Sequence, residues 1–306
     1  MSTDRNGLAT RTIEFMTLSN TSDPDCLTHP PLPLPKSLSA PERAAARFAV
    51  EGNVVITGGA GNIALSTARA LLEHGASGLV LWDLETTLRS SQVAVHSLAT
   101  AFPKARIFSV AVDVTDSRSI TDGIDATIQT LGSVDHLFCF AGIVGCFPAL
   151  TMTETQWRKT LEVNTTGAFL CAQACATQMA KQKRSAPGCS ITLTASISGH
   201  RVNYPQPQVA YNVSKAAVIS LKSSLAAEWA AYGIRVNSIS PGYMDTVLNA
   251  GEGSLAEMRE SWASRNPMGR MGAVGELDGV CVLLAGKAGS YINGADFVVD
   301  GGAVCF

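Results

Sequence analysis

A tyrosine and a lysine stand four residues apart in the segment Tyr211-Asn212-Val213-Ser214-Lys215. In a helix this spacing places both side chains on one face. An ammonium group near a phenol favours the phenolate and should lower the Tyr211 pKa. The phenol could then exchange a proton with an alcohol or a carbonyl near neutral pH. The pattern YxxxK alone is common, so its weight depends on the residues that precede it.

Two polar residues upstream extend this candidate catalytic group. Ser196 ends an apolar segment at 189–196, and a hydroxyl at the carboxyl end of a parallel strand faces the ligand crevice, where it can orient a substrate oxygen. Ser198 is an alternative, and either serine could instead bond its own backbone in a loop. Asn164 falls within a predicted helix, where an amide is a mild misfit. It either satisfies a buried neighbour or holds a water and bends the helix.

A glycine-rich turn at 57–64, which reads TGGAGNIA, separates an apolar strand from a helical segment. Glycines in this position let backbone N–H groups approach a pyrophosphate, and the helix N-terminus adds partial positive charge. Glycines also serve ordinary tight turns. The placement inside a strand–turn–helix unit favours a dinucleotide site.

Asp83 closes the second predicted strand, 25 residues after Gly58. A carboxylate there can accept hydrogen bonds from the adenosine ribose hydroxyls, and it repels a 2′-phosphate. The alternative is a helix N-cap or a solvated loop acid. We therefore expect NAD(H) to be the preferred cofactor. NADP(H) stays possible because Arg69 or Arg89 could turn toward a phosphate.

Strand and helix patterns alternate from Asn53 to the end of the chain. The predicted strands are 53–57, 78–83, 105–113, 134–142, 189–196, 234–242 and 295–302. The predicted helices are 63–75, about 86–101, 117–132, about 154–183 and 209–233. Apolar strands that alternate with helices indicate a parallel sheet covered on both faces. The fold class is α/β, a doubly wound seven-stranded parallel sheet in a single domain at 46–306.

Residues 1–45 differ from the rest in composition. Six of the 13 prolines fall between Pro24 and Pro41, and such a segment favours polyproline II and cannot pair in a sheet. We expect a poorly ordered tail, or one that lies over the body of the protein. The formal net charge of −2 and the 6% of aromatic residues argue against a nucleic-acid partner bound through a basic, base-stacking surface.

The cysteines and the apolar runs indicate the compartment. The eight cysteines form no CxxC pair and show no zinc spacing, so no metal site is expected. Small buried thiols in a reducing compartment are favoured instead. No apolar run approaches the roughly 18 residues of a membrane span, and the N-terminus lacks an apolar signal core. We expect a cytoplasmic protein with no membrane partner.

Together these motifs resemble the short-chain dehydrogenase/reductase family over about residues 50–306. The segments SISGHRVNYPQPQVAYNVSKAA and SPGYMDT are most similar to fungal members that act on sugar alcohols and ketoses. The resemblance implies a Rossmann-like, NAD(P)-binding domain at 46–306 and makes Ser196, Tyr211, Lys215 and Asn164 the catalytic residues. The implied cofactor-binding residues are Thr57, Gly58, Gly59, Asn62, Ile63, Asp83, Asp113, Val114, Ala141, Gly142, Tyr211, Lys215, Pro241, Gly242, Met244 and Thr246.

Two segments depart from the family pattern. Asn62 and Ala64 stand where the last two glycines of TGxxxGxG would be. Asn62 puts a side chain where backbone meets pyrophosphate, although Asn tolerates unusual φ values. The family's Asn-Asn-Ala-Gly reads CFAG at 139–142, so the adenine-side loop loses an amide. These departures sustain a non-enzymatic alternative, a catalytically weak dinucleotide-binding sensor or scaffold.

The resemblance implies hydride transfer between a nicotinamide and the carbonyl carbon of a secondary alcohol–ketone pair. Tyr211 would give or accept the proton, and Ser196 would position the oxygen. Lys215 would lower the Tyr211 pKa and hold the nicotinamide ribose. Asn164 would anchor a water that relays protons from Lys215.

A polyol or ketose is the expected small-molecule substrate. The loop between Ser196 and Tyr211 supplies hydroxyl-reading candidates, and the alternative is a loop that is polar because it faces water. A ketone of fungal secondary metabolism is the alternative substrate. The apolar faces of helices 154–183 and 209–233 predict a homodimer or homotetramer. The candidate substrate-reading residues are His200, Asn203, Tyr204 and Tyr243, with Met258 and Trp262 as residues of a lid or of ordinary packing.

Overall fold

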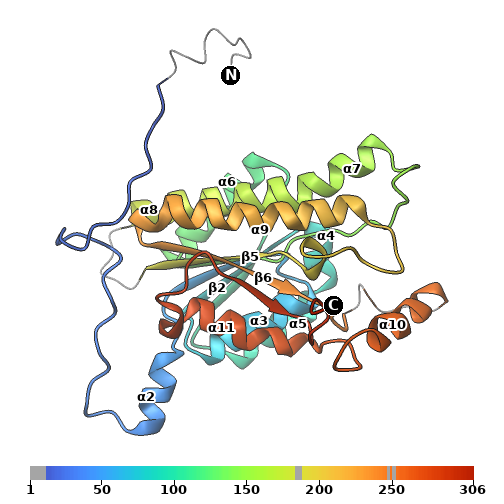
Figure 1. Cartoon of the computed structure of the whole chain (residues 1–306). Helices are drawn as coiled ribbons and strands as arrows, with labels where there is room; N and C mark the ends of the chain where they lie inside the picture. The colour runs from blue at the N-terminus through green and yellow to red at the C-terminus, as the bar shows by residue number, and fades with distance from the viewer. Residues whose placement is uncertain (1–11, 183–187, 247–248, 250–252) are drawn as a thin grey trace.

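Seven parallel strands form one sheet in the order β3-β2-β1-β4-β5-β6-β7 (Figure 1). The computed structural model describes residues 12–182, 188–246, 249 and 253–306. The strands are β1 Asn53–Thr57, β2 Gly78–Asp83, β3 Arg106–Ala111, β4 His136–Cys139, β5 Cys189–Thr194, β6 Ile234–Pro241 and β7 Asp296–Val299. All seven predicted strands and the doubly wound parallel sheet are confirmed. The chain order reverses between β1 and β4, which is where such sheets bind ligands.

Side chains alternate between the two faces of the sheet and build a core on each. Val55, Val80 and Leu137 belong to one buried cluster. Their neighbours Val54, Ile56, Leu79 and Phe138 belong to the other. Because both faces are apolar, each needs a layer of helices, and this is why the strands read as continuous apolar runs.

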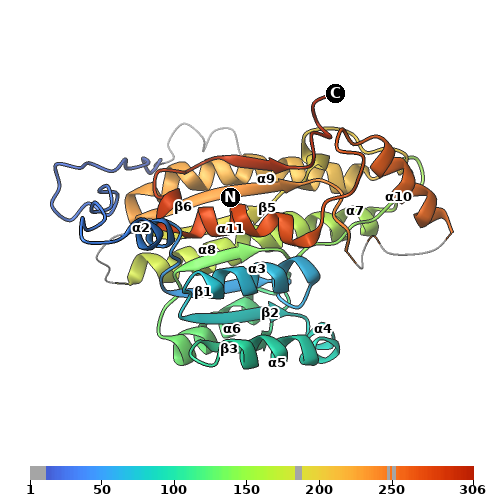
Figure 2. The same cartoon turned by 90° about the horizontal axis from the view of Figure 1, so that it is seen from below.

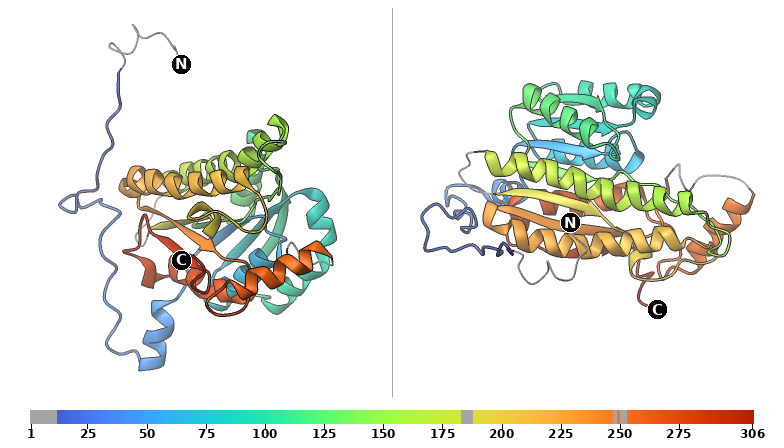
Figure 3. Two further views of the ribbon diagram at one scale, coloured as in Figure 1. Left: turned by 45° about the vertical axis from the view of Figure 1, so that its right-hand side comes forward. Right: turned by 90° about the horizontal axis from the view of Figure 1, so that it is seen from above.

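Helices cover both faces (Figures 1 and 2). The first face carries α6 Ser117–Leu131, α8 Ala168–Lys181 and α9 Val209–Trp229, and the second carries α3 Asn62–Glu73, α5 Gln92–Ala101 and α11 Asp278–Ala285. Figure 3 shows α8 and α9 side by side above the sheet. The helix α11 was not predicted, because an apolar run of about six residues does not distinguish a buried helix from a strand.

Two predicted helices are interrupted. The helix expected at 86–101 is two helices, α4 Glu85–Ser90 and α5, which are separated at Ser91. The helix expected at 154–183 consists of α7 Glu154–Leu161, the π-helical turn η1 Glu162–Gly167 and α8. Residue 183 lies outside the described residues. The π-helical turn contains Asn164. At the residue where a bend was one of the expectations, the helix thus changes from α-helical to π-helical hydrogen bonding.

The predicted tail contains one helix that the sequence reading missed. This helix, α2 Ala40–Arg47, begins with a capping box between Ser39 and Glu42 and has no buried residue. Residues 12–38 form no helix or strand and are mostly exposed. Residues 1–11 of the predicted tail lie outside the described residues. None of the described helices is both long and apolar enough to cross a membrane.

The amino ends of the strands border a cavity of about 870 Å³. Five tail residues between Thr21 and Pro31 line it, together with His136, Arg235 and Lys287 of the body. Leu27 packs closely against Gly233, because a Cβ added to Gly233 would lie only 2.8 Å from the Leu27 Cβ. The predicted ligand residues stand at the carboxyl ends of the strands, so the cavity and the predicted site occupy opposite edges of the sheet.

Candidate functional site

The predicted site residues gather along the carboxyl edge of the sheet. Thr57 and Asp83 end β1 and β2, and Ser196 follows β5. Tyr211 and Lys215 reach this edge from α9. The remaining predicted residues follow β3, β4 and β6 in the same way: Asp113 and Val114, Ala141 and Gly142, and the segment from Pro241 to Thr246.

The glycine-rich turn has room for backbone alone. Gly58 has φ +63°, and a Cβ there would lie 2.7 Å from the Ala141 nitrogen. A Cβ on Gly59 would lie 2.8 Å from the Leu81 Cα. The helix α3 that follows has the N-cap Gly61, with no side-chain cap, so its first N–H groups stay available to an anion. The turn therefore fits a dinucleotide pyrophosphate.

Asn62 does not obstruct this turn. It is the first residue of α3, and its side chain is exposed. Ala64, at the position of the last family glycine, is buried between helix and sheet. Phe140, which replaces a family asparagine, stacks on Phe138 with ring centroids 6.0 Å apart. The main chain at Ala141 is tied instead to the Thr57 hydroxyl, at 3.3 Å.

Asp83 lies beside the glycine-rich turn. One carboxylate oxygen accepts the Ala60 N–H at 3.1 Å and the other accepts the Leu84 N–H at 2.8 Å. Both oxygens keep a lone pair that can accept a further hydrogen bond. Arg89 forms an ion pair with Glu85 at 2.8 Å. The nearest basic residue along the chain is therefore already paired with a carboxylate.

Arg69 is engaged away from Asp83. Its guanidinium lies over the Phe102 ring, 5.8 Å from the centroid. Arg69 and Arg89, the two arginines that could accept a 2′-phosphate, thus both have contacts other than Asp83.

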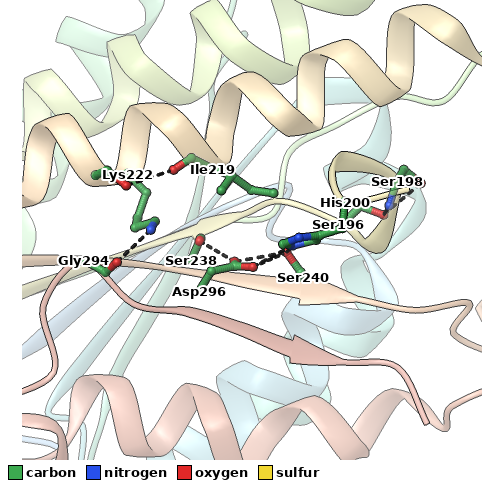
Figure 4. Close-up of polar contacts among 10 residues, drawn as sticks. Ser196, Ser198, His200, Ile219, Lys222, Ser238, Ser240, Gly294 and Asp296 are labelled. Carbon is green, nitrogen blue, oxygen red and sulfur yellow. Dashed lines mark hydrogen bonds and ion pairs between the residues drawn. The ribbon is translucent and has the colours of Figure 1, made fainter. Parts of the chain in front are cut away.

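The serine, the tyrosine and the lysine lie near one another at the carboxyl edge of the sheet. Ser196 is buried, and its hydroxyl bonds the Tyr211 phenol. The same hydroxyl accepts the Ser198 N–H at 3.1 Å and donates to the Ser198 Oγ at 3.1 Å (Figure 4). Lys215 is buried, and its Nζ donates to the Thr194 carbonyl at 2.8 Å. The three side chains can thus deliver a proton and a hydrogen bond to one substrate oxygen.

The predicted lowering of the Tyr211 pKa is wrong for this arrangement. Burial raises the pKa of Tyr211 to about 12, and the side-chain hydrogen bond between Tyr211 and Ser196 opposes this only in part. Burial also lowers the pKa of Lys215 to about 8. Desolvation disfavours the charged form of both groups, and it is the largest cause of both shifts.

Asn164 ties the loop after β4 to α9. Its Oδ1 accepts the Ile143 N–H at 2.8 Å, and its Nδ2 donates to the Ile143 carbonyl at 2.9 Å and to the Ser214 Oγ at 3.0 Å. Both amide hydrogens are therefore used within the protein. A Cβ on Gly142 would lie 3.3 Å from the Asn164 Oδ1, so a larger residue there would press on this amide.

The remaining cofactor candidates shape the walls of the edge. Asp113 is exposed, and its carboxylate accepts two bonds from Thr115, which lower its pKa. Val114 packs against Gly167 of the π-helical turn. A Cβ on Gly242 would lie 2.9 Å from the Asp300 Cα. Met244 is buried and forms a β-bridge with Gly272.

Tyr243 is the centre of a polar cluster beside Tyr211. Its phenol oxygen accepts from Asn203 Nδ2 at 2.6 Å and from Gln206 Nε2 at 2.9 Å. Its ring stacks on Trp262 of the helix α10 Ser254–Ser264, with centroids 4.2 Å apart. With two hydrogen bonds accepted, the Tyr243 O–H hydrogen is free to donate. Gln206 was missed, because a polar loop pattern does not show which amides become buried.

His200 and Tyr204 have other contacts. His200 Nε2 lies 2.8 Å from Asp296 Oδ2 and 3.1 Å from Ser240 Oγ. This placement favours an anchoring role over the predicted contact with substrate. Tyr204 is 60% exposed, and the Arg265 guanidinium covers its ring at 4.4 Å from the centroid. Among the described residues, no group of three His, Cys, Asp or Glu side chains is placed to hold a metal.

Comparison with known proteins gives matches along most of the chain. Residues 58–304 match the family model described as Enoyl-(Acyl carrier protein) reductase. The NADP-dependent mannitol dehydrogenase of Hypocrea jecorina is 34% identical over 88% of this chain and 98% of that protein. The ribulose-forming D-arabinitol 2-dehydrogenase of Scheffersomyces stipitis is 39% identical over 85% of this chain and 96% of that protein.

A solved structure shares the fold. The gluconate 5-dehydrogenase from Burkholderia cenocepacia J2315, in complex with NADP and tartrate, has a TM-score of 0.77 to this chain at 29% identity. The match covers 86% of this chain and 99% of that one.

A parallel sheet with a glycine-rich turn and a Ser–Tyr–Lys group at its carboxyl edge defines a dinucleotide-dependent oxidoreductase. The chain belongs to the short-chain dehydrogenase/reductase family. It is an enzyme that acts on CH–OH groups with NAD(P). The alternative of a non-catalytic sensor or scaffold is not retained.

Proposed function

We propose that this enzyme interconverts a polyol and the corresponding ketose. The observation that carries the proposal is the cluster of Asn203, Gln206 and Tyr243 beside Tyr211. Such fixed donors and acceptors recognise a hydroxylated chain and reject an apolar ketone, because the latter leaves the buried polar groups unpaired. The mannitol and arabinitol dehydrogenases among the relatives support a substrate of this kind.

The protein's own residues handle the substrate oxygen and its proton. The turn at 57–64 and Asp83 would hold the cofactor, which when bound would supply or accept the hydride. Tyr211 donates its proton to the oxygen during reduction and accepts it during oxidation. Ser196 would turn its hydroxyl hydrogen from Ser198 Oγ to the same oxygen and so orient it. Lys215 would hold the nicotinamide ribose and place positive charge near the Tyr211 ring.

Asn164 supports this group from behind. Because its amide fixes the loop at Ile143 and the α9 residue Ser214, it holds the two walls between which the nicotinamide end is expected. A water anchored at Asn164 would relay protons from Lys215, as the family resemblance implies.

We also infer a preference for NAD(H) over NADP(H). The Asp83 carboxylate keeps free lone pairs for ribose hydroxyls and would face a 2′-phosphate of like charge. Arg89 and Arg69 are engaged with Glu85 and Phe102. NADP(H) stays the second candidate, because three of the relatives are named as NADP-dependent mannitol dehydrogenases.

The oligomer is proposed to be a dimer or tetramer in the cytoplasm. The outward side of α9 presents small or apolar exposed residues, among them Val213, Ala216 and Ser220, which allow close approach of a second copy with closed symmetry. The cysteines are mostly buried, which suits small apolar side chains in a reducing compartment. Sedimentation at micromolar concentration tests the assembly, and a monomer would reject it.

Absorbance at the nicotinamide band tests the reaction. The enzyme is assayed with NADH and with NADPH against fructose, sorbose and ribulose, and against cyclic apolar ketones of similar size. We expect turnover of at least one ketose and none of the apolar ketones. Tyr243→Phe should raise KM for the ketose more than it lowers kcat. A clear preference for apolar ketones would favour the secondary-metabolite alternative.

A further inference from the structure

The turn that carries Ser196 is held between α9 and the last two strands. This turn is the 3₁₀ helix η2 Ile197–Gly199, with Ser196 as its N-cap. On the α9 side, a Cβ on Gly199 would lie 2.8 Å from the Lys215 carbonyl carbon. The backbone of η2 therefore packs directly on that of α9, with the Ile219 Cδ1 at the same distance from this position.

On the opposite side, the residue after η2 reaches the sheet. His200 Nε2 lies 2.8 Å from Asp296 Oδ2, at the start of β7 (Figure 4). The His200 N–H also bonds the Ile197 carbonyl at 3.0 Å, so ring and turn are joined through a short stretch of backbone. His200 is thus the side chain through which the catalytic turn contacts β7.

Asp296 is built into the sheet face beneath α9. Its Oδ1 accepts from the Ser238 hydroxyl, and Ser240 Oγ lies 2.9 Å from its Oδ2. Both serines are fully buried, and the Asp296 side chain is only 11% exposed. A carboxylate buried to this degree needs its hydrogen bonds, and the His200 ring supplies one of them.

We propose that Asp296 and His200 are positioning residues for the hydride-transfer reaction. Asp296 fixes the His200 ring, and His200 fixes the turn that places the Ser196 hydroxyl beside Tyr211. Neither residue contacts the substrate. Catalysis depends on sub-ångström placement, and a displacement of about 1 Å at a distance can cost around 10²-fold in rate. The proposal rests on the proposed function, because Ser196 must orient a substrate oxygen.

Substitution of His200 tests the contact. His200→Leu removes the donor to Asp296, and we expect kcat to fall by about 10- to 100-fold, with the cofactor Kd nearly unchanged. His200→Gln offers an amide N–H near the position of Nε2 and should restore most of the rate. If the Leu variant keeps the wild-type kcat, or if the Gln variant is equally impaired, the proposal is wrong.

Lys222→Met is the matched control. Lys222 is buried on the face of α9 that also carries Lys215, and its Nζ donates to the Gly294 carbonyl at 2.7 Å (Figure 4). Its loss removes a buried bond between α9 and the loop before β7, but it spares the Ser196 turn. We expect a lower melting temperature with kcat unchanged. An equal loss of kcat would show that the effect is general to this face, and would overturn the proposal.

Two further measurements complete the test. In a double-mutant cycle, His200→Leu combined with Asp296→Asn should cost little more than His200→Leu alone, because the two act as one unit. Additive losses would contradict this. Hydrogen exchange in residues 196–201 should rise in His200→Leu and not in Lys222→Met. The hydrogen-exchange readout needs no substrate. If the wild-type enzyme reduces no ketose, the proposed function is rejected, and the exchange rates still decide whether His200 positions the Ser196 turn.

Discussion

Lys215 and Tyr211 share one face of α9, but the lysine Nζ bonds the Thr194 carbonyl at 2.8 Å and lies 5.5 Å from the centroid of the tyrosine ring. The ammonium thus stands near the ring and is anchored to the end of β5. Because both groups are removed from water, their pKa values move toward the neutral forms, to about 12 for Tyr211 and about 8 for Lys215. The phenol of this arrangement holds its proton at neutral pH.

Tyr211→Phe should abolish turnover and leave cofactor binding intact, because only the transferable proton is removed. We expect kcat to fall by about 10²- to 10⁴-fold, while the Kd for the reduced cofactor, followed by fluorescence, stays close to wild type. Tyr232→Phe, at an exposed tyrosine far from Ser196, is the control. A near-native rate for Tyr211→Phe would refute the acid/base assignment.

Lys215→Met should lose activity and part of the cofactor affinity. The Lys215 pKa is lowered to about 8, so its ammonium is present below that pH and is lost as the pH rises through it. Since kcat/KM reports the free enzyme, the wild-type kcat/KM for the cofactor should fall above about pH 8, and the variant should lack this limb. A Kd for the cofactor unchanged by the substitution would restrict Lys215 to an effect on the phenol.

Asp83→Ser should shift cofactor choice toward NADP(H). Repulsion between the carboxylate and a 2′-phosphate is worth about one to two decades of affinity after solvent screening. The measurement is the ratio of kcat/KM for the two cofactors in wild type and variant. Glu85→Ser, which frees Arg89 but keeps Asp83, is the control. A wild type that already prefers NADP(H), or a ratio that does not move, would show that Asp83 does not discriminate.

Deletion of residues 1–45 should leave folding and activity largely intact. The deletion truncates α2, which has no buried residue, and removes an exposed, proline-dense segment that lies away from the carboxyl edge. Melting temperature and kcat/KM are compared with the full chain. A large fall in melting temperature would show that packing at the cavity, where Leu27 meets Gly233, is needed for stability.

His136 should make the fold sensitive to acid. Burial lowers its pKa from 6.5 to about 4, and its Nδ1 is buried with no hydrogen-bond partner among the described residues. The unfolded chain therefore binds a proton between these two pH values while the folded chain does not. The stability from this group is complete above pH 6.5 and falls by roughly 3 kcal/mol as the pH drops toward 4.

Denaturant unfolding at several pH values measures this effect. His136→Gln can keep the donor that bonds the Glu51 carbonyl but cannot be protonated in this range. The slope of unfolding free energy against pH should therefore be shallower in the variant. An identical slope in both proteins would assign the acid sensitivity to other groups.

Local sequence patterns determined much of the fold. Strands such as 78–83 were predicted to the residue, because a parallel strand buried on both faces must be apolar throughout. The turn at Gly58 was predictable because of a steric requirement. A Cβ on Gly58 would lie 2.7 Å from the Ala141 nitrogen, so this position tolerates glycine alone. The spacing of Tyr211 and Lys215 fixes their common face in any helix.

Tertiary contacts decided what those side chains do. His200 was expected to face substrate, but its partner Asp296 is 96 residues away, and a sequence does not show which distant carboxylate a loop histidine meets. The pKa directions at Tyr211 and Lys215 were set by burial, which follows from how β5, η2 and α9 pack and not from spacing. Local patterns express steric and hydrogen-bonding rules that act within a few residues, whereas desolvation and long-range pairing exist only once the chain has folded.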